Sequence, residues 1–522
     1  MVDQDYFCEM YNIHMITKTD YVTFRSCPRA YYYQLNDPQQ AKATDEVAQK
    51  RIDEGKLVGN YAHLFFANTV KIKDNPDMAN MANQVAITKK LLPTSNYIAE
   101  ASFQFDDLFC AVDILAKNGN GYDIYEVKAS TDAYKHLKEY APDVAFQKYV
   151  LELCGLEIKN CYILHLNPNY IRNGQIDVKQ MLVPYQLNAL HEELKDKQKV
   201  ANYFQDEYEL LPSNIATMRK LNKLPTYGNC DKSCDFYAFC HSNLPQPNVL
   251  DLCGMWKSKA HALIENGIIT FQNVLDNKER LAEFKVKLNH YQMIQMQTHL
   301  ANDQKPYVNK EIINHFFKTL KFPLYHLDFE TMNEAVPPFD GAGCYQQIPF
   351  QYSLHIQEAI NGKTIHKEFL ADKLDSEYEL AKQLCKDIPL NAMSVSYNMT
   401  FEKTVLKHLA TRFPDLSDHL MNIHDHMIDL LVPFRDCCFY SVKQNGSNSI
   451  KFVMPAICPQ TAQAYHNLKQ VHNGGEALTL FPKMLKMDQS HKLEARTNML
   501  AYCKQDTLSM VDVLNALWKL AK

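Results

Sequence analysis

The sequence predicts a two-domain α/β protein with a helical connector. Its 522 residues exceed what one hydrophobic core usually organises. Helical periodicity and strand-like runs occur in both halves of the chain. A proline-containing break at residues 244–248 separates the halves, and strand character begins again after Lys321. We therefore expect domains at residues 1–245 and 316–522, joined by a connector at 246–315.

The composition indicates a folded cytoplasmic protein. Hydrophobic residues make up 46% of the chain and charged residues 22%, which excludes a mainly disordered protein. The first residues carry no signal-peptide pattern, and no apolar run reaches transmembrane length. We therefore expect the 15 cysteines to be reduced thiols, either packed in the core or used as metal ligands.

The net charge of −5 argues against a protein that coats nucleic acid without regard to sequence. It does not argue against a nuclease, because acidic residues that hold catalytic cations lower the total charge. A basic stretch at residues 218–223 offers contacts to phosphate.

Three strands in the N-terminal half are predicted to position a pair of acids. The strands are expected at residues 97–105, 108–116 and 122–129, with a hairpin turn at residues 117–121.

Glu126 and Lys128 lie two positions apart in the third strand, so both side chains project from one face, and Asp113 lies on the partner strand. Two carboxylates beside a lysine can bind Mg²⁺ or Mn²⁺ and position water against a phosphodiester. The alternative is a solvated strand face with a cross-strand salt bridge.

These residues resemble the PD-(D/E)XK nuclease core of the RecB type. The matching runs are residues 105–115, 123–128 and 147–149. The resemblance implies a restriction-endonuclease-like fold in which Asp113 and Glu126 hold one or two metal ions and Lys128 assists the attacking water. Gln147 matches the motif on the following helix. His63 is a loose match to a histidine that often precedes these motifs.

Four cysteines form a second candidate site. Cys230, Cys234 and Cys240 lie within eleven residues, and Cys27 is a distant fourth. Four thiolates can hold Zn²⁺ or a 4Fe-4S cluster. This arrangement resembles the iron-sulfur staple of CRISPR-associated RecB-like exonucleases and AddB-type helicase-nucleases, although the gap before Cys234 is one residue longer than usual. The alternative is a set of buried, unligated cysteines.

The connector resembles a helix-hairpin-helix element at residues 252–255, 263–268 and 270–271. Such an element presents backbone N–H groups to phosphate without reading sequence. The alternative, which we expect here, is a plain helical linker that packs Trp256 and Leu263 into a core.

The C-terminal half carries a third candidate site. Asp328 and Glu330 project from one strand face with Phe329 turned inward, an unfavourable arrangement unless a cation neutralises it. Tyr502 and Asp506 lie one helical turn apart, so both can reach the same site. The alternative is that each acid caps a helix or pairs locally.

These pieces resemble the DnaQ-like exonucleases of the RNase H-like fold, in the tyrosine subclass called DEDDy. Asp328 and Glu330 match the first motif, residues 398–402 the second, and Tyr502 with Asp506 the third. In that family four acids hold two cations and the tyrosine orients the nucleophile. Glu402 stands where the family usually has aspartate, and Asp429 is an alternative for that role.

The combined resemblance is to bacterial proteins that fuse an iron-sulfur RecB-like domain to a DnaQ-like domain. It implies a metal-dependent deoxyribonuclease that takes part in DNA processing, repair or defence. The C-terminal site would act as a 3′→5′ exonuclease, and the N-terminal site would supply a second cleavage activity. DNA is the expected partner rather than RNA. An RNA-trimming exonuclease and a catalytically inactive nucleic-acid-binding scaffold are the alternatives.

Overall fold

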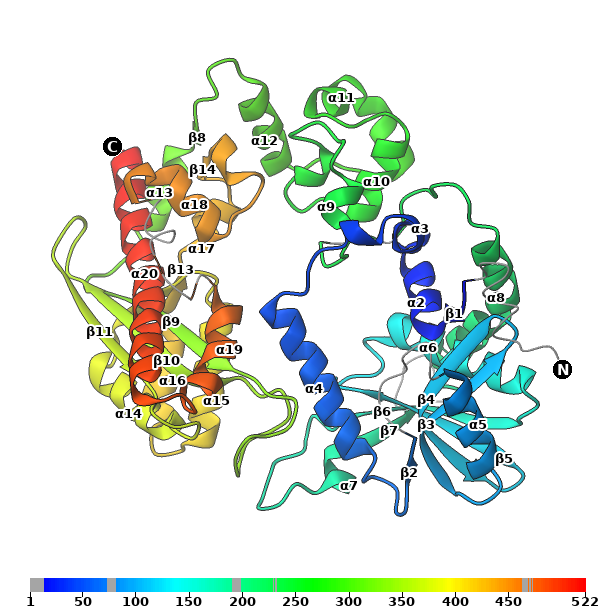
Figure 1. Ribbon diagram of the computed structural model, residues 1–522. Coiled ribbons are helices and arrows are strands. Elements are labelled where there is room, and N and C mark those ends of the chain that lie inside the picture. The colour runs from blue at the N-terminus through cyan, green and yellow to red at the C-terminus, as the bar shows by residue number, and fades with distance from the viewer. Residues whose placement is uncertain are drawn as a thin grey trace. The chain divides into compact units, whose positions relative to one another are not determined.

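The computed structural model describes residues 14–72, 81–189, 199–228, 230, 232–461, 468, 471 and 473–522. The chain forms two compact units (Figure 1). The first is Met1–Ser242 together with Glu334–Tyr345, and the second is Asn243–Asn333 together with Gln346–Lys522. Both units combine helices with a sheet, which confirms the predicted mixed α/β class. Within the described part of the chain, no helix has both the length and the apolar character needed to cross a bilayer.

The first unit is built on one mixed sheet. Its elements are β1 (Ile16–Thr17), α2 (Lys18–Ser26), α3 (Pro28–Asn36), α4 (Glu46–Ala62), β2 (Val70–Lys71), α5 (Met81–Leu91), β3 (Tyr97–Phe105), β4 (Leu108–Asn118), β5 (Gly121–Lys128), α6 (Leu137–Leu153), β6 (Ile158–Leu166), α7 (Val178–Met181), β7 (Leu182–Gln186), α8 (Lys199–Arg219) and α9 (Tyr237–Cys240). The strand order is β2-β3-β4-β5-β6-β7, with β1 paired to β4. Strands β3, β4 and β5 are antiparallel, and β6 runs parallel to β5.

The three predicted strands correspond to β3, β4 and β5, but the turn between the last two is shorter than expected. Asn118 pairs with Gly121, which leaves a two-residue loop. Gly119 has φ 61°, a conformation that glycine adopts without strain. The hydrogen-bonded ladder therefore extends into the stretch whose composition predicted a turn.

Helices α6 and α4 pack on opposite faces of this sheet. Residues of α6 such as Phe146 and Val150 pack against Val112 and Ile124 in the main core. On the opposite face, Val58 of α4 belongs to a second buried cluster. Side chains alternate between the two faces, so those of β5 that share a face with Ile124 point toward α6.

The second unit also has one principal sheet. Its elements are η3 (Val249–Asp251), α10 (Lys257–Glu265), α11 (Phe271–Asp276), η4 (Lys278–Phe284), α12 (His290–Leu300), β8 (Tyr307–Val308), α13 (Lys310–Phe317), β9 (Leu324–Met332), β10 (Ile348–Gln357), β11 (Thr364–Leu370), α14 (Glu377–Asp387), β12 (Met393–Ser396), α15 (Thr400–Arg412), α16 (Ser417–Asp425), β13 (Met427–Asp429), α17 (Leu431–Arg435), β14 (Phe439–Tyr440), η5 (Val442–Gln444), α18 (Ile450–Ile457), η6 (Pro459–Thr461), α19 (Gly474–Met484) and α20 (Gln489–Ala521).

The predicted connector belongs to this second unit and begins with the short helices α10 and α11. Leu263 is buried, as expected of a packed linker. Trp256 is 74% exposed, so its predicted burial is wrong. The reason is local, because Trp256 is the N-cap of α10 with φ −67° and ψ 129°, and its side chain does not follow the buried face of the helix.

The principal sheet has the strand order β11-β10-β9-β12-β13. Strands β10 and β11 are antiparallel to their neighbours, whereas β12 runs parallel to both β9 and β13. Leu327, Phe329 and Tyr352 share a core with α14, α15 and α16. The alternate residues face α20, since Ser353 hydrogen-bonds Thr507 over 2.7 Å. Figure 1 shows α20 crossing the sheet on that side.

Three histidines on the α20-facing side make the stability of this unit depend on pH. His326 is fully buried and its Nε2 lies 2.9 Å from Gln357 Oε1. The rings of His355 and His366 lie 4.6 Å apart. Burial lowers the pKa of His326 to about 4, of His355 to about 3 and of His366 to about 4. All three are therefore neutral in the folded protein at pH 7.

Lowering the pH from 7 to 5 is expected to remove about 2 kcal/mol of the second unit's stability through His326, a contribution that comparison with His326→Gln separates from those of other titrating groups. An unfolded histidine takes up a proton below about pH 6.5, whereas folded His326 does so only near pH 4, so the folded state loses stability between these values. Hydrogen exchange of peptides from β9 and β10 measures the effect.

The variant His326→Gln should lose about 2 kcal/mol less than wild type over this pH range. The variant His290→Gln, at an exposed position of the same unit, should behave as wild type. An equal pH dependence in both variants would contradict the assignment.

Candidate functional site

The N-terminal acids lie where the ladder between β4 and β5 ends. The last paired residues on this side are Ile114 and Tyr125. Beyond them the strands separate, and Asp113 Oδ2 accepts a hydrogen bond from the backbone N–H of Val127 over 2.7 Å. The adjoining residue of β3, Glu100, has φ 61°, which is strained for a residue other than glycine. The sheet is therefore irregular on both sides of Asp113.

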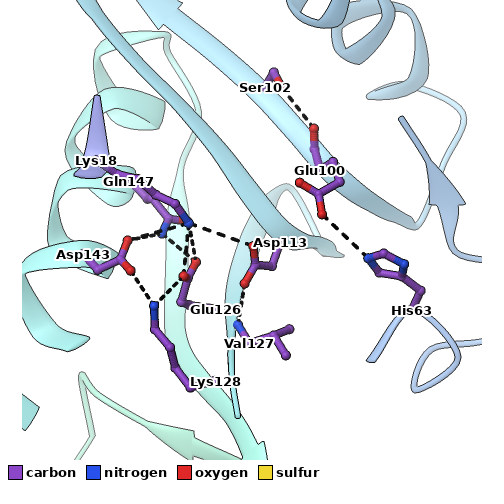
Figure 2. A network of polar contacts seen from close by, with 10 residues as sticks. All are labelled: Lys18, His63, Glu100, Ser102, Asp113, Glu126, Val127, Lys128, Asp143 and Gln147. Atoms are coloured by element: carbon purple, nitrogen blue, oxygen red, sulfur yellow. Dashed lines mark hydrogen bonds and ion pairs between the residues drawn. The ribbon is translucent and has the colours of Figure 1, made fainter. Parts of the chain in front are cut away.

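Glu126 lies at the centre of a polar network between β5 and α6 (Figure 2). Lys128 Nζ lies 2.8 Å from Glu126 Oε1 and 2.6 Å from Asp143 Oδ2. Gln147 Nε2 donates to Glu126 Oε2 over 2.8 Å and to Asp143 Oδ1 over 3.0 Å. Lys18 Nζ lies 3.0 Å from both oxygens of Glu126. The structure thus brings together the four residues predicted for this site and adds Lys18 and Asp143.

The charges in this network strongly shift one another. Burial and the neighbouring charges of Asp113 and Asp143 raise the pKa of Glu126 to about 7. Burial also raises the pKa of Asp113. For Asp143, Lys18 and Lys128 outweigh burial and hold the pKa of the carboxyl well below its usual range. Burial is likewise outweighed at Lys128, whose pKa is raised by Glu126 and Asp143. Burial is also outweighed at Lys18, whose pKa is raised by Asp143, Glu126 and Asp113, so both lysines stay protonated beside the three acids.

A cavity of about 620 Å³ opens onto these acids. Its walls include Asp113 and Glu126 together with His63 and Glu100. His63 Nε2 lies 3.9 Å from Glu100 Oε1, at the end of α4 (Figure 2). The loosely matched histidine therefore faces the same space as the predicted acids. A small cation or a phosphate group could reach Asp113 and Glu126 through this cavity.

Of the residues that were not predicted for the N-terminal site, Asp143 follows a spacing that is visible in the sequence. Asp143 and Gln147 lie four residues apart on α6, so one helical face carries both. Lys18 follows no such spacing, because it lies 108 positions from its partner Glu126. Glu100 was included in a predicted strand, but its backbone conformation carries no signal in the sequence.

The C-terminal acids gather between β9 and α20. Asp328, Glu330 and Cys503 each offer a ligand atom, and these atoms lie within 4.8 Å of one another. Cys503 Sγ is 3.6 Å from Asp328 Oδ2. Tyr502 is buried on the same helix, one turn before Asp506. The first and third predicted motifs are therefore adjacent in the fold.

The carboxylates of the C-terminal site strongly repel one another. Burial, followed by the charges of Asp506 and Glu330, raises the pKa of Asp328 well above its usual range. Burial and Asp506 do the same for the pKa of Glu330, with Lys451 opposing the rise. Burial and the adjacent acids raise the pKa of the Tyr502 hydroxyl, which therefore stays protonated. Lys451 Nζ lies 5.7 Å from the centre of the Tyr502 ring, and no spacing between the two residues indicated this contact in advance.

Glu402 completes the group of acids. It lies in the first turn of α15 and is 3% exposed. Burial is the main cause that raises its pKa to about 7, and its charge also raises the pKa of Asp328. Glu402 Oε2 has no hydrogen-bond partner within the described residues. A buried carboxylate oxygen without a donor fits a site that receives a cation.

Asp429, the alternative to Glu402 as the acid of the second motif, holds a turn of the backbone. Its Oδ1 accepts hydrogen bonds from the backbone N–H of Asn398 over 2.8 Å and of Leu431 over 2.9 Å. Asn398 has φ 70°, so these bonds hold a strained turn between β12 and α15. Asp429 therefore positions the turn that leads to Glu402.

The predicted cysteine ligands also gather in the first unit. Cys27 joins α2 to α3 and belongs to one buried cluster with Cys234 and Cys240. Cys230, Cys234 and Cys27 line a common cavity. A Cβ atom added to Gly228 would lie 2.8 Å from Cys27 Cα, so the segment before Cys230 passes directly over Cys27. The described cysteines form no disulfide.

A histidine next to this group was missed by the sequence analysis. A ring nitrogen of His241 lies within 4.8 Å of Cys230 Sγ. His241 directly follows Cys240 in the sequence, so the run Cys240-His241 was visible as a possible ligand pair. Thiolates and an imidazole are both suitable ligands for zinc or iron. The described residues thus include possible metal ligands in both units.

Comparison with known proteins finds a family match in the second half of the chain. The family described as "Domain of unknown function (DUF2779)" matches residues 325–449. This stretch contains Asp328, Glu330 and Glu402 and ends before Tyr502 and Asp506. Its description assigns no activity.

A protein of Mycoplasma pneumoniae is similar over a longer stretch. The "Uncharacterized protein MG366 homolog" of that organism is 24% identical over 344 residues, which cover 62% of this chain and 49% of the relative. The match therefore spans about half the length of that relative. Its name states no function.

Proposed function

We propose that the protein is a metal-dependent nuclease that hydrolyses phosphodiester bonds of DNA. The second unit would act as a 3′→5′ exonuclease, and the first would carry a second nuclease site. The observation that carries this proposal is a group of buried and half-buried acids on β9, α15 and α20, beside the protonated Tyr502. The acids are Asp328, Glu330, Glu402 and Asp506. Buried carboxylates that repel one another are unfavourable unless cations bind them.

The topology of the second unit supports an RNase H-like, DnaQ-type domain. Such a domain has three antiparallel strands followed by two strands parallel to the first. The order β11-β10-β9-β12-β13 and the strand directions fit that arrangement. The acids lie on the first strand, at the start of a helix after the fourth strand, and on the last helix. These are the positions that the resemblance to the DEDDy exonucleases implies.

The topology of the first unit supports a PD-(D/E)XK core. Three antiparallel strands, β3 to β5, are followed by α6 and by β6, which is parallel to β5. Asp113 and Glu126 lie where β4 and β5 separate, and Gln147 reaches Glu126 from α6. The cysteine group joins the residues before this core to those after it, as an iron-sulfur staple would.

In this proposal the bound metal ion, Tyr502 and Lys128 have different chemical roles. Bound Mg²⁺ or Mn²⁺ would activate water and neutralise charge that develops on the phosphate. Tyr502 stays protonated, so its hydroxyl can donate a hydrogen bond that orients water or the phosphate. Lys128 also stays protonated, so it can orient a nucleophile but cannot act as the general base.

The proposal is tested with full-length protein purified without oxygen. The substrates are 5′-labelled single-stranded DNA, double-stranded DNA and matching RNA, each with Mg²⁺ or Mn²⁺. We expect DNA to be shortened stepwise from its 3′ end. Absence of cleavage on every substrate would overturn the proposal, and faster shortening of RNA would reassign the substrate.

Glu126→Gln is expected to lower cleavage by the N-terminal site by about 100-fold, because a neutral amide is a weaker metal ligand than a carboxylate. DNA whose last 3′ linkages are phosphorothioates isolates this activity from the exonuclease. The substitution keeps the side-chain volume and the hydrogen bond with Gln147 can be retained.

The matched control is Glu139→Gln, which changes an exposed acid in the first turn of α6. It should cleave the protected DNA at the wild-type rate. Wild-type cleavage by Glu126→Gln would remove the first unit from the proposal.

A further inference from the structure

Lys18 lies among the N-terminal acids, where a metal ion would be expected. Its Nζ is 3.0 Å from both oxygens of Glu126, 3.8 Å from Asp143 Oδ1 and 3.9 Å from Asp113 Oδ1. Figure 2 shows the side chain reaching the acids from the side opposite Lys128. One ammonium group therefore contacts every acid of the network.

Long-range strand pairing places Lys18 there. Ile16 and Thr17 of β1 pair in parallel with Leu108 and Phe109 of β4, the strand that carries Asp113. Thr17 then caps α2, and its hydroxyl accepts a hydrogen bond from Asp20 N. Lys18 is the first residue of α2, so strand pairing and helix cap together direct it to the acids. Strand pairing and helix capping therefore determine where the Lys18 side chain lies.

The two lysines of this network are held differently. Lys128 Nζ lies within 2.8 Å of both Glu126 and Asp143 and 5.3 Å from the Tyr140 ring. Lys18 has one close partner, Glu126, and two more distant ones. The two side chains are almost equally exposed, at 24% for Lys18 and 23% for Lys128, so the difference lies in their short contacts. Withdrawal of Lys18 breaks short contacts with one acid, whereas withdrawal of Lys128 breaks short contacts with two.

A divalent cation at this site would bind the carboxylate oxygens that Lys18 contacts. It would reach Asp113 and Glu126 from the 620 Å³ cavity, on whose walls both acids lie. Lys18 already neutralises Glu126 through both of its oxygens. An ammonium and a divalent cation a few ångströms apart repel each other, and this repulsion is large in a partly buried site. The two cations therefore compete for Glu126.

We infer that Lys18 is an internal cation that occupies the N-terminal acids and must withdraw before a divalent metal ion binds, so that Lys18 sets the metal affinity of this site. The inference rests on the proposed metal-binding role of Asp113 and Glu126. It makes Lys18 a positioning residue whose removal tightens metal binding, whereas the removal of a ligand would weaken it.

The test measures Mn²⁺ affinity by calorimetry and by the electron paramagnetic resonance signal of free Mn²⁺. The protein is the full chain carrying Asp328→Ala and Asp506→Ala, so that the first unit dominates the titration. Lys18→Met should bind Mn²⁺ at least about tenfold more tightly than this background, and Lys18→Arg should bind as the background does. Lys18→Gln should follow Lys18→Met, and it serves as the neutral variant if the methionine impairs folding.

The matched control is Lys56→Met, which removes a charge from the wall of the same cavity. It should change the affinity by less than about twofold if contact with the acids, rather than general charge, is responsible. Unchanged or weaker Mn²⁺ binding in both neutral Lys18 variants would overturn the inference alone. Absence of Mn²⁺ binding in the background and in every variant would overturn the proposed N-terminal metal site together with the inference.

Discussion

Asp328→Asn is expected to slow 3′→5′ trimming about 1000-fold and to raise the melting temperature of the metal-free protein. The amide keeps the shape of the side chain but removes a charge that holds a cation, and 1000-fold corresponds to about 4 kcal/mol. The stability gain follows from the sign of the pKa shift. The pKa of Asp328 is higher in the folded chain than in the unfolded one, so its ionised form destabilises the fold at pH 7.

Nuclease assays and thermal unfolding with and without Mn²⁺ measure both effects. Mn²⁺ should stabilise the wild-type protein strongly and Asp328→Asn much less, because a ligand stabilises the state that binds it. Glu494→Gln, an exposed acid on α20, is the control and should leave rate and stability unchanged. An Asp328→Asn variant that is both slow and less stable would point to a structural role for this carboxylate instead.

Local patterns made a large part of both sites predictable. Strand-like runs identified β3, β4 and β5 and, after Lys321, the start of β9. Glu126 and Lys128 share a face because successive side chains of a strand point to opposite faces. Tyr502 and Asp506 are one turn apart on α20, and the helical period alone brings them to one side.

Other features depend on contacts or backbone conformations that no local pattern carries. Lys18 reaches Glu126 only because β1 pairs with β4. Glu100 has the pattern of a strand residue but a left-handed conformation. Trp256 has an apolar side chain, but as a helix cap it lies outside the helical period that predicted its burial.

The two sites differ in how their negative charge is balanced. In the first unit, Lys18 and Lys128 lie among the acids and hold the pKa of Asp143 low. In the second unit, the acids raise one another's pKa values, with Lys451 as an opposing charge at Glu330. The C-terminal site therefore has the larger electrostatic gain from a divalent cation. We expect its activity to persist at metal concentrations that leave the N-terminal site inactive.

Cys27→Ala is expected to lower the melting temperature of the first unit by about 10 °C or more and to abolish the proposed metal binding by the cysteine group. The cysteine group joins α2 and α3 to the segment that begins near Gly228, so a bound cluster or zinc ion would close a loop around the whole unit. Loss of such a ligand removes metal-binding energy that also stabilises the fold, and about 5 kcal/mol is enough for this shift. Metal analysis, visible absorbance and thermal unfolding are the measurements.

Cys161→Ala separates this effect from ordinary core packing. Cys161 is fully buried on β6, and its loss leaves only a small cavity, with a destabilisation of about 1 to 2 kcal/mol. Visible absorbance that disappears in Cys27→Ala and persists in Cys161→Ala would identify an iron-sulfur cluster, and a colourless protein that loses zinc would identify zinc. Equal, small destabilisation in both variants without any metal loss would show that Cys27 is an unligated core residue.

Because α2 carries Lys18 at one end and Cys27 directly after the other, loss of the metal should also weaken the arrangement of the N-terminal acids. The proposed C-terminal exonuclease activity should keep its rate in both variants, since its acids lie on β9, α15 and α20 of the second unit.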